Sequence, residues 1–331
     1  MTELRKDPVS ERWVVVAPER LKRPTDFHSA QRAPRPDASC PFCAGREALT
    51  PPEVLAYRNG GAPDSPGWRV RVVPNKFPAL QIDGSLARHT EGPFERVNGV
   101  GAHEVIIETP DHAKTLATME TREIEEVLHA FRKRISDLKR DERVRYVLIF
   151  KNHGHGSGAT LEHAHSQLVA LPVVPDVVRE ELDGAKRYRA AHRSCVFCDV
   201  IRHELGAGRR IVCEDGDVVA LAPYASRFPF ETWLLPQRHG SRFEQEPESV
   251  CAGVARAIKT VVQRLDAALE SPPYNFVLHN APPAEEVGDF FHWHIELMPR
   301  LARGGLESGT GLYINPVSPE EAANILRTVP V

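Results

Sequence analysis

The sequence predicts an α+β protein of two tandem modules, each with an antiparallel sheet flanked by helices. Three observations predict this fold. Two C-x-x-C pairs begin at Cys40 and Cys195, each is followed by the same order of strands around one amphipathic helix, and each half closes on a His-x-His strand. The 331 residues suffice for two domains, which we place at residues 1–175 and 194–331.

β-branched and apolar residues predict the strands of the first module, and Pro-containing loops separate them. Apolar residues recur at helical spacing from Ile124 to Leu138, which predicts one long amphipathic helix. In chain order we expect strands at residues 12–17, 68–73, 101–107, 146–150 and 163–172, with the helix before the last two.

The second module repeats this order after a polar connector at residues 176–193. Its helix is marked by apolar residues from Val254 to Leu265. Its strands are expected at residues 217–221, 232–235, 274–278 and 292–299. We expect the antiparallel sheets of the two modules to join edge to edge.

The composition is that of a globular protein without a broad charged surface. Hydrophobic residues make up 41% of the chain, and 42 basic against 45 acidic side chains give a net charge of -3. This balance offers no cationic field to a nucleic acid or an anionic membrane, so neither is expected as a partner. The charged N-terminus lacks a secretory signal and no apolar run reaches about 18 residues, so we expect a cytoplasmic protein.

In a reducing compartment, paired cysteines are more often metal ligands or redox groups than disulfides. Zinc prefers four thiolate and imidazole ligands in a tetrahedron, and the repeat nominates two histidines for each cysteine pair. Redox pairs and histidines with structural roles remain the alternatives, and Cys213 and Cys251 are interpreted as buried apolar residues. We therefore expect two structural Zn²⁺ ions per chain, bound by Cys40, Cys43, His103 and His163 and by Cys195, Cys198, His239 and His292.

A glycine-rich loop before the first His-x-His indicates a phosphate site. Its glycines let backbone N–H groups approach an anion, and Ser157, Gly158 and Thr160 are the expected contacts. His163, His165 and Gln167 share one face of the following strand because side chains at i and i+2 point the same way. If His163 binds metal, His165 is placed for nucleophilic attack on phosphorus and Gln167 for hydrogen bonding to phosphoryl oxygens. The alternative is a flexible turn followed by a surface histidine.

At these residues the chain resembles the galactose-1-phosphate uridylyltransferase branch of the histidine-triad superfamily, over nearly its whole length. The resemblance implies two tandem histidine-triad-like modules, a homodimer, and ping-pong transfer of a nucleoside monophosphate through a nucleotidyl-histidine. The implied nucleophile is His165, the second histidine of H-x-H-x-Q. The family usually has proline where this chain has Ala164.

The resemblance also implies the nucleotide contacts. Arg20 and Arg23 match arginines that hold the diphosphate, although a solvated surface role is the alternative for both. The remaining implied contacts are the base and ribose loop Asn75, Lys76 and Phe77 and the phosphate-binding positions Asn152 and Thr160.

The second C-x-x-C pair indicates which branch of the family the chain resembles. It is similar to the pattern of a plant ADP-glucose phosphorylase-like branch, whereas other members carry an iron site built from a glutamate and three histidines. His279, His292 and His294 would be available for iron.

Three functions remain open at this point. The first is UDP-glucose:hexose-1-phosphate uridylyltransferase, acting on a nucleotide sugar and a sugar 1-phosphate in galactose metabolism. The second is transfer of AMP from ADP-glucose to phosphate, and the third is a zinc-stabilised nucleotide-binding module without turnover. The residue types beside the base loop do not decide between uracil and adenine.

Overall fold

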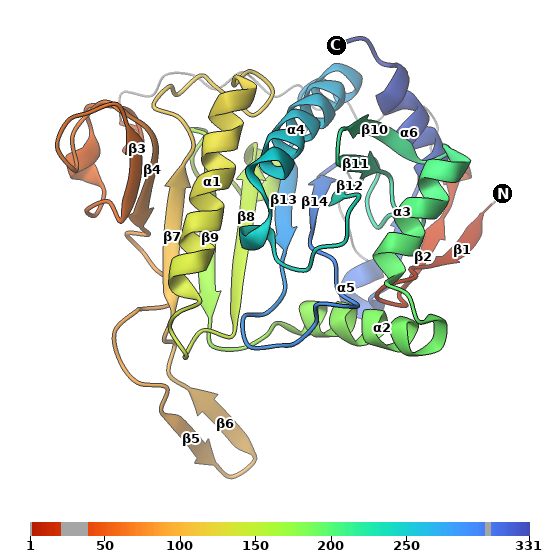
Figure 1. Ribbon diagram of the computed structural model, residues 1–331, viewed down its shortest axis with the longest axis horizontal. Coiled ribbons are helices and arrows are strands. Elements are labelled where there is room, and N and C mark those ends of the chain that lie inside the picture. Colours follow the sequence, from red (N-terminus) through yellow and green to blue (C-terminus); the bar gives the residue numbers. More distant parts are fainter. Residues whose placement is uncertain (1, 21–38, 302–305) are drawn as a thin grey trace.

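The computed structural model describes residues 2–20, 39–301 and 306–331. Its centre is one ten-stranded antiparallel sheet (Figure 1). Both halves of the chain contribute to it, and they meet where strand β8 (Tyr146–His153) pairs with β13 (Tyr274–His279). The predicted α+β class and the edge-to-edge junction of the two sheets are confirmed.

The first half supplies five neighbouring strands of this sheet, in the spatial order β8-β9-β7-β4-β3. Alternation of buried and partly exposed residues along β8 and β9 is typical of strands with one face packed in a core and the other face less completely covered. The other bounds are β3 (Leu55–Arg58), β4 (Trp68–Pro74), β7 (Ala102–Ile107) and β9 (His165–Leu171).

The second half supplies the other five strands, in the order β10-β11-β12-β14-β13. Every residue of β11, β12 and β14 is buried, which explains their nearly continuous apolar sequence. The bounds are β10 (Ile211–Asp215), β11 (Val218–Leu221), β12 (Thr232–Pro236) and β14 (His294–Pro299).

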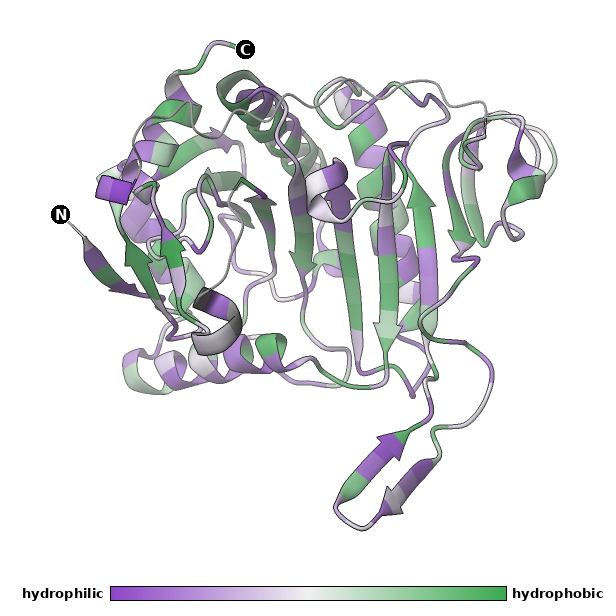
Figure 2. Cartoon of the chain, turned by 180° about the vertical axis from the view of Figure 1, so that it is seen from behind, coloured by the Kyte–Doolittle hydropathy of each residue, from purple (hydrophilic) through white to green (hydrophobic). Residues whose placement is uncertain are grey.

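Helices α1 (Thr121–Leu138) and α4 (Glu248–Leu269) lie side by side on one face of the sheet (Figure 1). Their apolar stripes and the strand residues beneath them form one large core, and hydrophobic residues run along the central strands in Figure 2. A capping box at Glu120 starts α1. A buried ion pair between Arg134 and Glu104, 2.7 Å apart, ties α1 to β7.

The expected polar connector is mostly a helix, α2 (Asp176–His192), followed by α3 (Val196–Ala207). Val178, Leu182 and Ala185 are buried in α2, so one apolar stripe packs inward while the other faces stay charged. Because so few apolar residues mark this helix, its sequence is typical of a linker. A second helix pair follows near the C-terminus, α5 (Leu306–Thr310) and α6 (Pro319–Thr328).

Three short strands form a separate small sheet in the order β1-β2-β15. They are β1 (Glu3–Lys6), β2 (Trp13–Val16) and β15 (Tyr313–Asn315). The predicted first strand is therefore β2, and it pairs with the C-terminal part of the chain rather than with the first repeat.

A hairpin of β5 (Arg88–Glu91) and β6 (Phe94–Val97) projects from the body (Figure 1), and all eight of its residues are exposed. Among the described residues, no helix is long and apolar enough to cross a membrane.

Candidate active site and metal centres

The two faces of the sheet carry different parts of the molecule. On β7, Ile106 packs with α1 in the large core, whereas Ile107 packs with Phe42 on the opposite face. His165, the cross-strand partner of Ile107, also has its ring against Phe42, with centroids 5.3 Å apart. The candidate nucleophile therefore lies on the face that α1 and α4 leave uncovered.

The ring of His165 is held in one orientation and one tautomer. Its Nδ1 lies 2.7 Å from the backbone oxygen of His163, so Nδ1–H donates and the lone pair stays on Nε2. Burial, together with the positive charge of Lys151, lowers the pKa of His165 below its ordinary range. The imidazole is thus neutral near pH 7, the form that can attack phosphorus.

Gln167 points to the same face and joins a hydrogen-bonded group there. Its Oε1 lies 2.8 Å from Nε2 of His103, and Asn75 Nδ2 lies 3.1 Å from the same nitrogen. Asn75 Oδ1 accepts from the N–H of Phe77, so Asn75 also shapes its own loop. The structure brings Gln167 and the predicted base loop together through His103.

The glycine-rich loop folds tightly beside the end of β13. Asn275 Nδ2 donates to Asn152 Oδ1 at 2.6 Å and to the Ser157 carbonyl at 3.0 Å. Gly158 has φ of +92°, a conformation that favours glycine. The Ser157 hydroxyl donates to the Gly154 carbonyl, so this side chain supports the loop instead of presenting its O–H outward.

The remaining predicted nucleotide contacts lie on the surface. Arg20, Lys76 and Thr160 are exposed, and Phe77 is 83% exposed. An aromatic ring this exposed suits a stacking surface for a planar group. Arg23 lies outside the described residues.

The first metal group consists of Cys40, Cys43, His112 and His163, whose ligand atoms lie within 4.8 Å of one another. The Cys43 sulfur is 3.4 Å from His112 Nδ1, and both sulfurs are 3.6 Å from His163 Nδ1. Tetrahedral zinc, with Zn–S of about 2.3 Å and Zn–N of about 2.0 Å, holds sulfur and nitrogen about 3.5 Å apart. His163 Nε2 donates to the Thr109 carbonyl, which leaves Nδ1 free for a metal. The donor set fits zinc.

The predicted ligand His103 is not in this group, and His112 takes the place assigned to it. His103 lies within β7, where its ring is engaged by Gln167 and Asn75. His112 lies five residues after the last residue of β7, in the loop that passes the cysteines. In the second half His239 likewise follows the end of β12, by three residues. His239 follows the end of its strand, and a search of the first half for a histidine after the end of the matching strand would have found His112.

The second metal group contains the four predicted residues, Cys195, Cys198, His239 and His292. The Cys198 sulfur lies 3.3 Å from His239 Nδ1 and 3.7 Å from His292 Nδ1. Nε2 of each histidine donates to a backbone oxygen, at 2.7 and 2.9 Å, which again directs Nδ1 toward the sulfurs. This group also fits zinc, as a scaffold for the start of α3.

A third cluster, Glu181, His279, His294 and Glu296, is wholly buried. His292, considered above for an iron site, belongs to the second group instead. Burial opposes protonation of His279, but the carboxylates of Glu181 and Glu296 raise its pKa to about 10. Glu296 also forms an ion pair with Arg227. Two cations of the chain itself therefore already neutralise these carboxylates.

His294 occupies the position in the second half that His165 has in the first. Its ring is stacked on His279, with centroids 4.6 Å apart, and lies 5.0 Å from Phe197 and 5.1 Å from Trp233. Only 1% of its surface is exposed, and burial lowers its pKa to about 4. Aromatic rings thus enclose His294 more completely than His165, which is 7% exposed.

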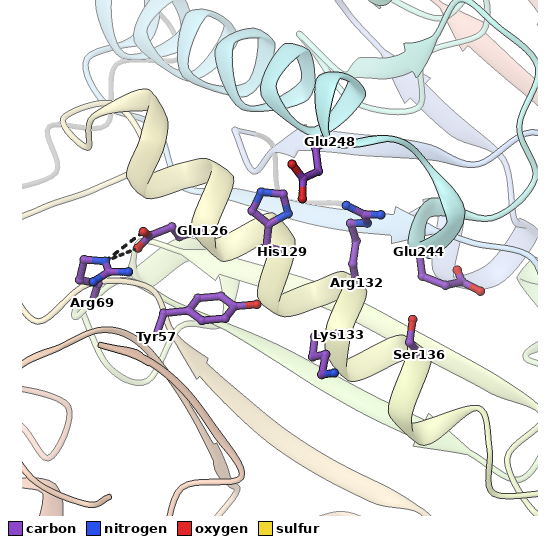
Figure 3. A pocket seen from close by; sticks show the side chains of 9 residues that line it. All are labelled: Tyr57, Arg69, Glu126, His129, Arg132, Lys133, Ser136, Glu244 and Glu248. Carbon is purple, nitrogen blue, oxygen red and sulfur yellow. Dashed lines mark hydrogen bonds and ion pairs between the residues drawn. The ribbon is translucent and has the colours of Figure 1, made fainter. Parts of the chain in front are cut away.

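A cavity of about 500 Å³ lies away from this site, against the outer side of α1 (Figure 3). Tyr57, Arg69 and residues of α1 face it, with Glu244 and Glu248 from the segment that starts α4. Its charges are mixed, and Arg69 already pairs with Glu126.

Comparison with known proteins places this geometry in a family. The galactose-1-phosphate uridyl transferase N-terminal domain model matches residues 1–175, and the C-terminal domain model matches residues 181–304. The chain belongs to the galactose-1-phosphate uridylyltransferase family. It is a nucleotidyltransferase-family chain with two Cys₂His₂ groups that could bind metal.

Family members with two different names are similar over nearly the whole chain. ADP-glucose phosphorylase of Arabidopsis thaliana is 38% identical over 99% of this chain and 93% of its own length. Galactose-1-phosphate uridylyltransferase of Thermotoga maritima is 31% identical over 100% of this chain and 99% of its own. The crystal structure of the Arabidopsis enzyme with bound ADP-glucose superposes with a TM-score of 0.85 at 35% identity, covering 100% of both chains.

Proposed function

We propose that this chain transfers a nucleoside monophosphate from a nucleotide sugar to a phosphate-bearing acceptor, through a covalent intermediate on His165. The observation that carries the proposal is the fixed tautomer of His165. With Nδ1–H bound to the His163 carbonyl, the Nε2 lone pair has no hydrogen-bond partner among the described residues. A neutral imidazole held in one orientation, with an unused lone pair on Nε2, is what nucleophilic attack on phosphorus requires.

In the first half-reaction, Nε2 of His165 attacks the α-phosphorus of the nucleotide sugar. A P–N bond forms, the bond from that phosphorus to the bridging oxygen breaks, and the sugar 1-phosphate leaves with the electron pair. In the second half-reaction, a phosphate oxygen of the acceptor attacks the same phosphorus and the P–N electron pair returns to Nε2. The Gln167 amide and backbone N–H groups of residues 154–156 would donate hydrogen bonds to the charged phosphoryl oxygens, whereas the N–H groups of Ser157 and Gly158 already donate to Gly154 and His155.

The metal groups enter this scheme only as scaffolds. Zinc in the first group would hold His163, and the His163 carbonyl in turn fixes the His165 ring. We propose that each Cys₂His₂ group takes one structural Zn²⁺ and that the chain forms the homodimer implied by its family.

For the substrates, we favour ADP-glucose as donor and inorganic phosphate as acceptor. This choice is supported by the 38% identity and the TM-score of 0.85 with the Arabidopsis ADP-glucose phosphorylase. UDP-glucose with a hexose 1-phosphate is the second candidate, supported by the family models and the 31% identity with the Thermotoga enzyme.

The test is to incubate the purified chain with ADP-glucose or UDP-glucose alone and to measure its intact mass. We expect an increase by AMP with ADP-glucose, located on His165 by peptide mapping and removed by phosphate. An increase by UMP with UDP-glucose, removed by galactose 1-phosphate, would favour the second candidate. No adduct with either donor would contradict the covalent mechanism and favour a binding module.

The matched control is His165→Gly. This variant should retain its metal and its fold but acquire no nucleotide. An adduct of unchanged yield in His165→Gly would show that another group is the nucleophile.

A further inference from the structure

We propose that His103 is a positioning residue for the transfer reaction, because it fixes the orientation of the Gln167 side-chain amide. The inference rests on the proposed function. The sequence repeat predicts His103 as a metal ligand. His103 belongs to none of the groups that could bind metal, and it is not the proposed nucleophile.

The hydrogen bonds of His103 determine where its proton is. Its Nδ1 accepts the backbone N–H of Ala79 at 3.1 Å, so this nitrogen carries no proton. The proton of the neutral ring is then on Nε2, which donates to Gln167 Oε1 at 2.8 Å. Asn75 Nδ2, 3.1 Å from the same nitrogen, is then a packing neighbour and not a second hydrogen-bond partner. His103 therefore donates to the amide oxygen of Gln167 and leaves the amide NH₂ directed elsewhere.

The amide of a glutamine has two orientations of opposite polarity. With Oε1 held by His103, the NH₂ donor of the half-buried Gln167 is turned away from His103, on the strand face that Gln167 shares with His165. If the amide rotated by half a turn, its oxygen would face the phosphoryl oxygens of the transferred group and repel them. The bond from His103 selects the productive orientation before the substrate binds.

His103 lies between two segments of the proposed substrate site, strand β9 and the base loop. It lies on β7, opposite Val169 of β9, and its backbone oxygen accepts the N–H of Asn75 at 2.8 Å. The Asn75 side chain also lies against its ring. The position of the base loop at residues 75–78 is thereby linked to the amide that faces the reacting phosphate.

The test compares His103→Leu with His103→Gln. Leucine fills a similar volume without a hydrogen bond, whereas glutamine offers both an acceptor for Ala79 and a donor for Gln167. In single-turnover formation of the His165 adduct, we expect His103→Leu to slow the step on the order of 10- to 100-fold, because a hydrogen bond to a charged group in the transition state is lost. His103→Gln should recover most of this loss. Equal rates in His103→Leu and the unsubstituted chain would overturn the proposal.

A double-variant cycle separates positioning from general damage. If His103 acts only through Gln167, adding His103→Leu to Gln167→Ala should slow adduct formation no further than Gln167→Ala alone. If the rate of the double variant fell by the product of the two single-variant factors, His103 would act independently of Gln167, and the proposal would be overturned.

Two measurements do not depend on the proposed activity. His103→Leu should keep the metal content of the unsubstituted chain, and a lost equivalent would identify His103 as a ligand. Selective ¹⁵N labelling of the side chains of the six glutamines gives few amide signals, and only that of Gln167 should shift strongly in His103→Leu. An unshifted Gln167 signal would contradict the hydrogen bond. If the unsubstituted chain forms no adduct, the proposed function is contradicted. The metal content and the Gln167 signal still test whether His103 donates a hydrogen bond to Gln167.

Discussion

At the scale of single residues, the positions of protons on three histidines decide what each ring does. His163 donates from Nε2 to a carbonyl and turns Nδ1 to the cysteines. His165 donates from Nδ1 to a carbonyl and leaves Nε2 for attack. His103 accepts at Nδ1 and donates from Nε2 to Gln167. In the proposed mechanism one residue type thus serves as metal ligand, nucleophile and positioning group, according to which backbone group contacts the ring.

The identity of His112 as a metal ligand gives a direct prediction. Replacing His112 by Ala removes one of four donors, so we expect the purified variant to contain about one zinc per chain instead of two. Elemental analysis by mass spectrometry would measure this content. His112→Ala with both equivalents of zinc would contradict the assignment.

Several site residues could be predicted from the sequence because a local pattern specifies them. The H-x-H-x-Q spacing places His163, His165 and Gln167 on one face of a strand whatever the rest of the fold. His112 could not be chosen over His103 in this way, since the choice depends on how a loop returns to Cys40 and Cys43. That path is a tertiary property.

At the scale of elements, helix α4 carries an unfavourable charge near its end. Burial raises the pKa of Asp266 to about 6, and one of its carboxylate oxygens is buried without a hydrogen-bond partner. The residue also lies in the last turn of the helix, where the partial negative charge of the helix C-terminus repels an anion. The ionised carboxylate therefore costs stability.

Asp266→Asn should stabilise the protein at high pH and not at low pH. Because the folded pKa is raised, protonated Asp266 favours the folded state below the unfolded pKa, and this contribution is lost as the pH rises through about 6. We expect the variant to gain about 1–2 kcal/mol of unfolding free energy at pH 8, with little difference at pH 4. Urea denaturation at both pH values would measure it, and an equal effect at both would contradict the electrostatic cause.

Most long elements could be predicted because their apolar residues follow a clear period. The helix expected around residues 124–138 is α1, and the apolar run at residues 146–150 lies within β8. That the connector at residues 176–193 is a helix could not be predicted, because α2 buries only a narrow stripe among charged residues. The exposed β5–β6 hairpin has no buried face, so its sequence carries no hydrophobic signal.

At the scale of the whole molecule, the two halves share one sheet and one core. Strands β8 and β13 pair over five residues, and Phe131 of α1 lies near Phe276 of β13 with ring centroids 6.4 Å apart. The sequence repeat predicts two similar halves and their junction, but it says nothing of the small sheet in which β2 pairs with β1 and with β15 from the C-terminal part of the chain. Such a pairing joins the two ends of the chain and has no local signature.

A shared core predicts cooperative unfolding. We expect one heat-absorption peak whose calorimetric and van't Hoff enthalpies agree for the zinc-loaded protein, since neither half can lose its packing without exposing the other at β8 and β13. Differential scanning calorimetry would measure this. Two separated peaks would show that the halves unfold independently, and would support division at residue 175.

The closure of His294 by Phe197 and Trp233 has a consequence for the counting of active sites. Although the repeat gives the chain two histidines in equivalent positions, Nε2 of His294 is buried behind Phe197 and Trp233, and His165 is the more exposed of the two, at 7% against 1%. Rapid-quench labelling should therefore saturate at one nucleotidyl group per chain, however high the donor concentration. In this proposal the second half repeats the strands and helix of the first half but adds no second nucleophile. Its role is then to support the fold.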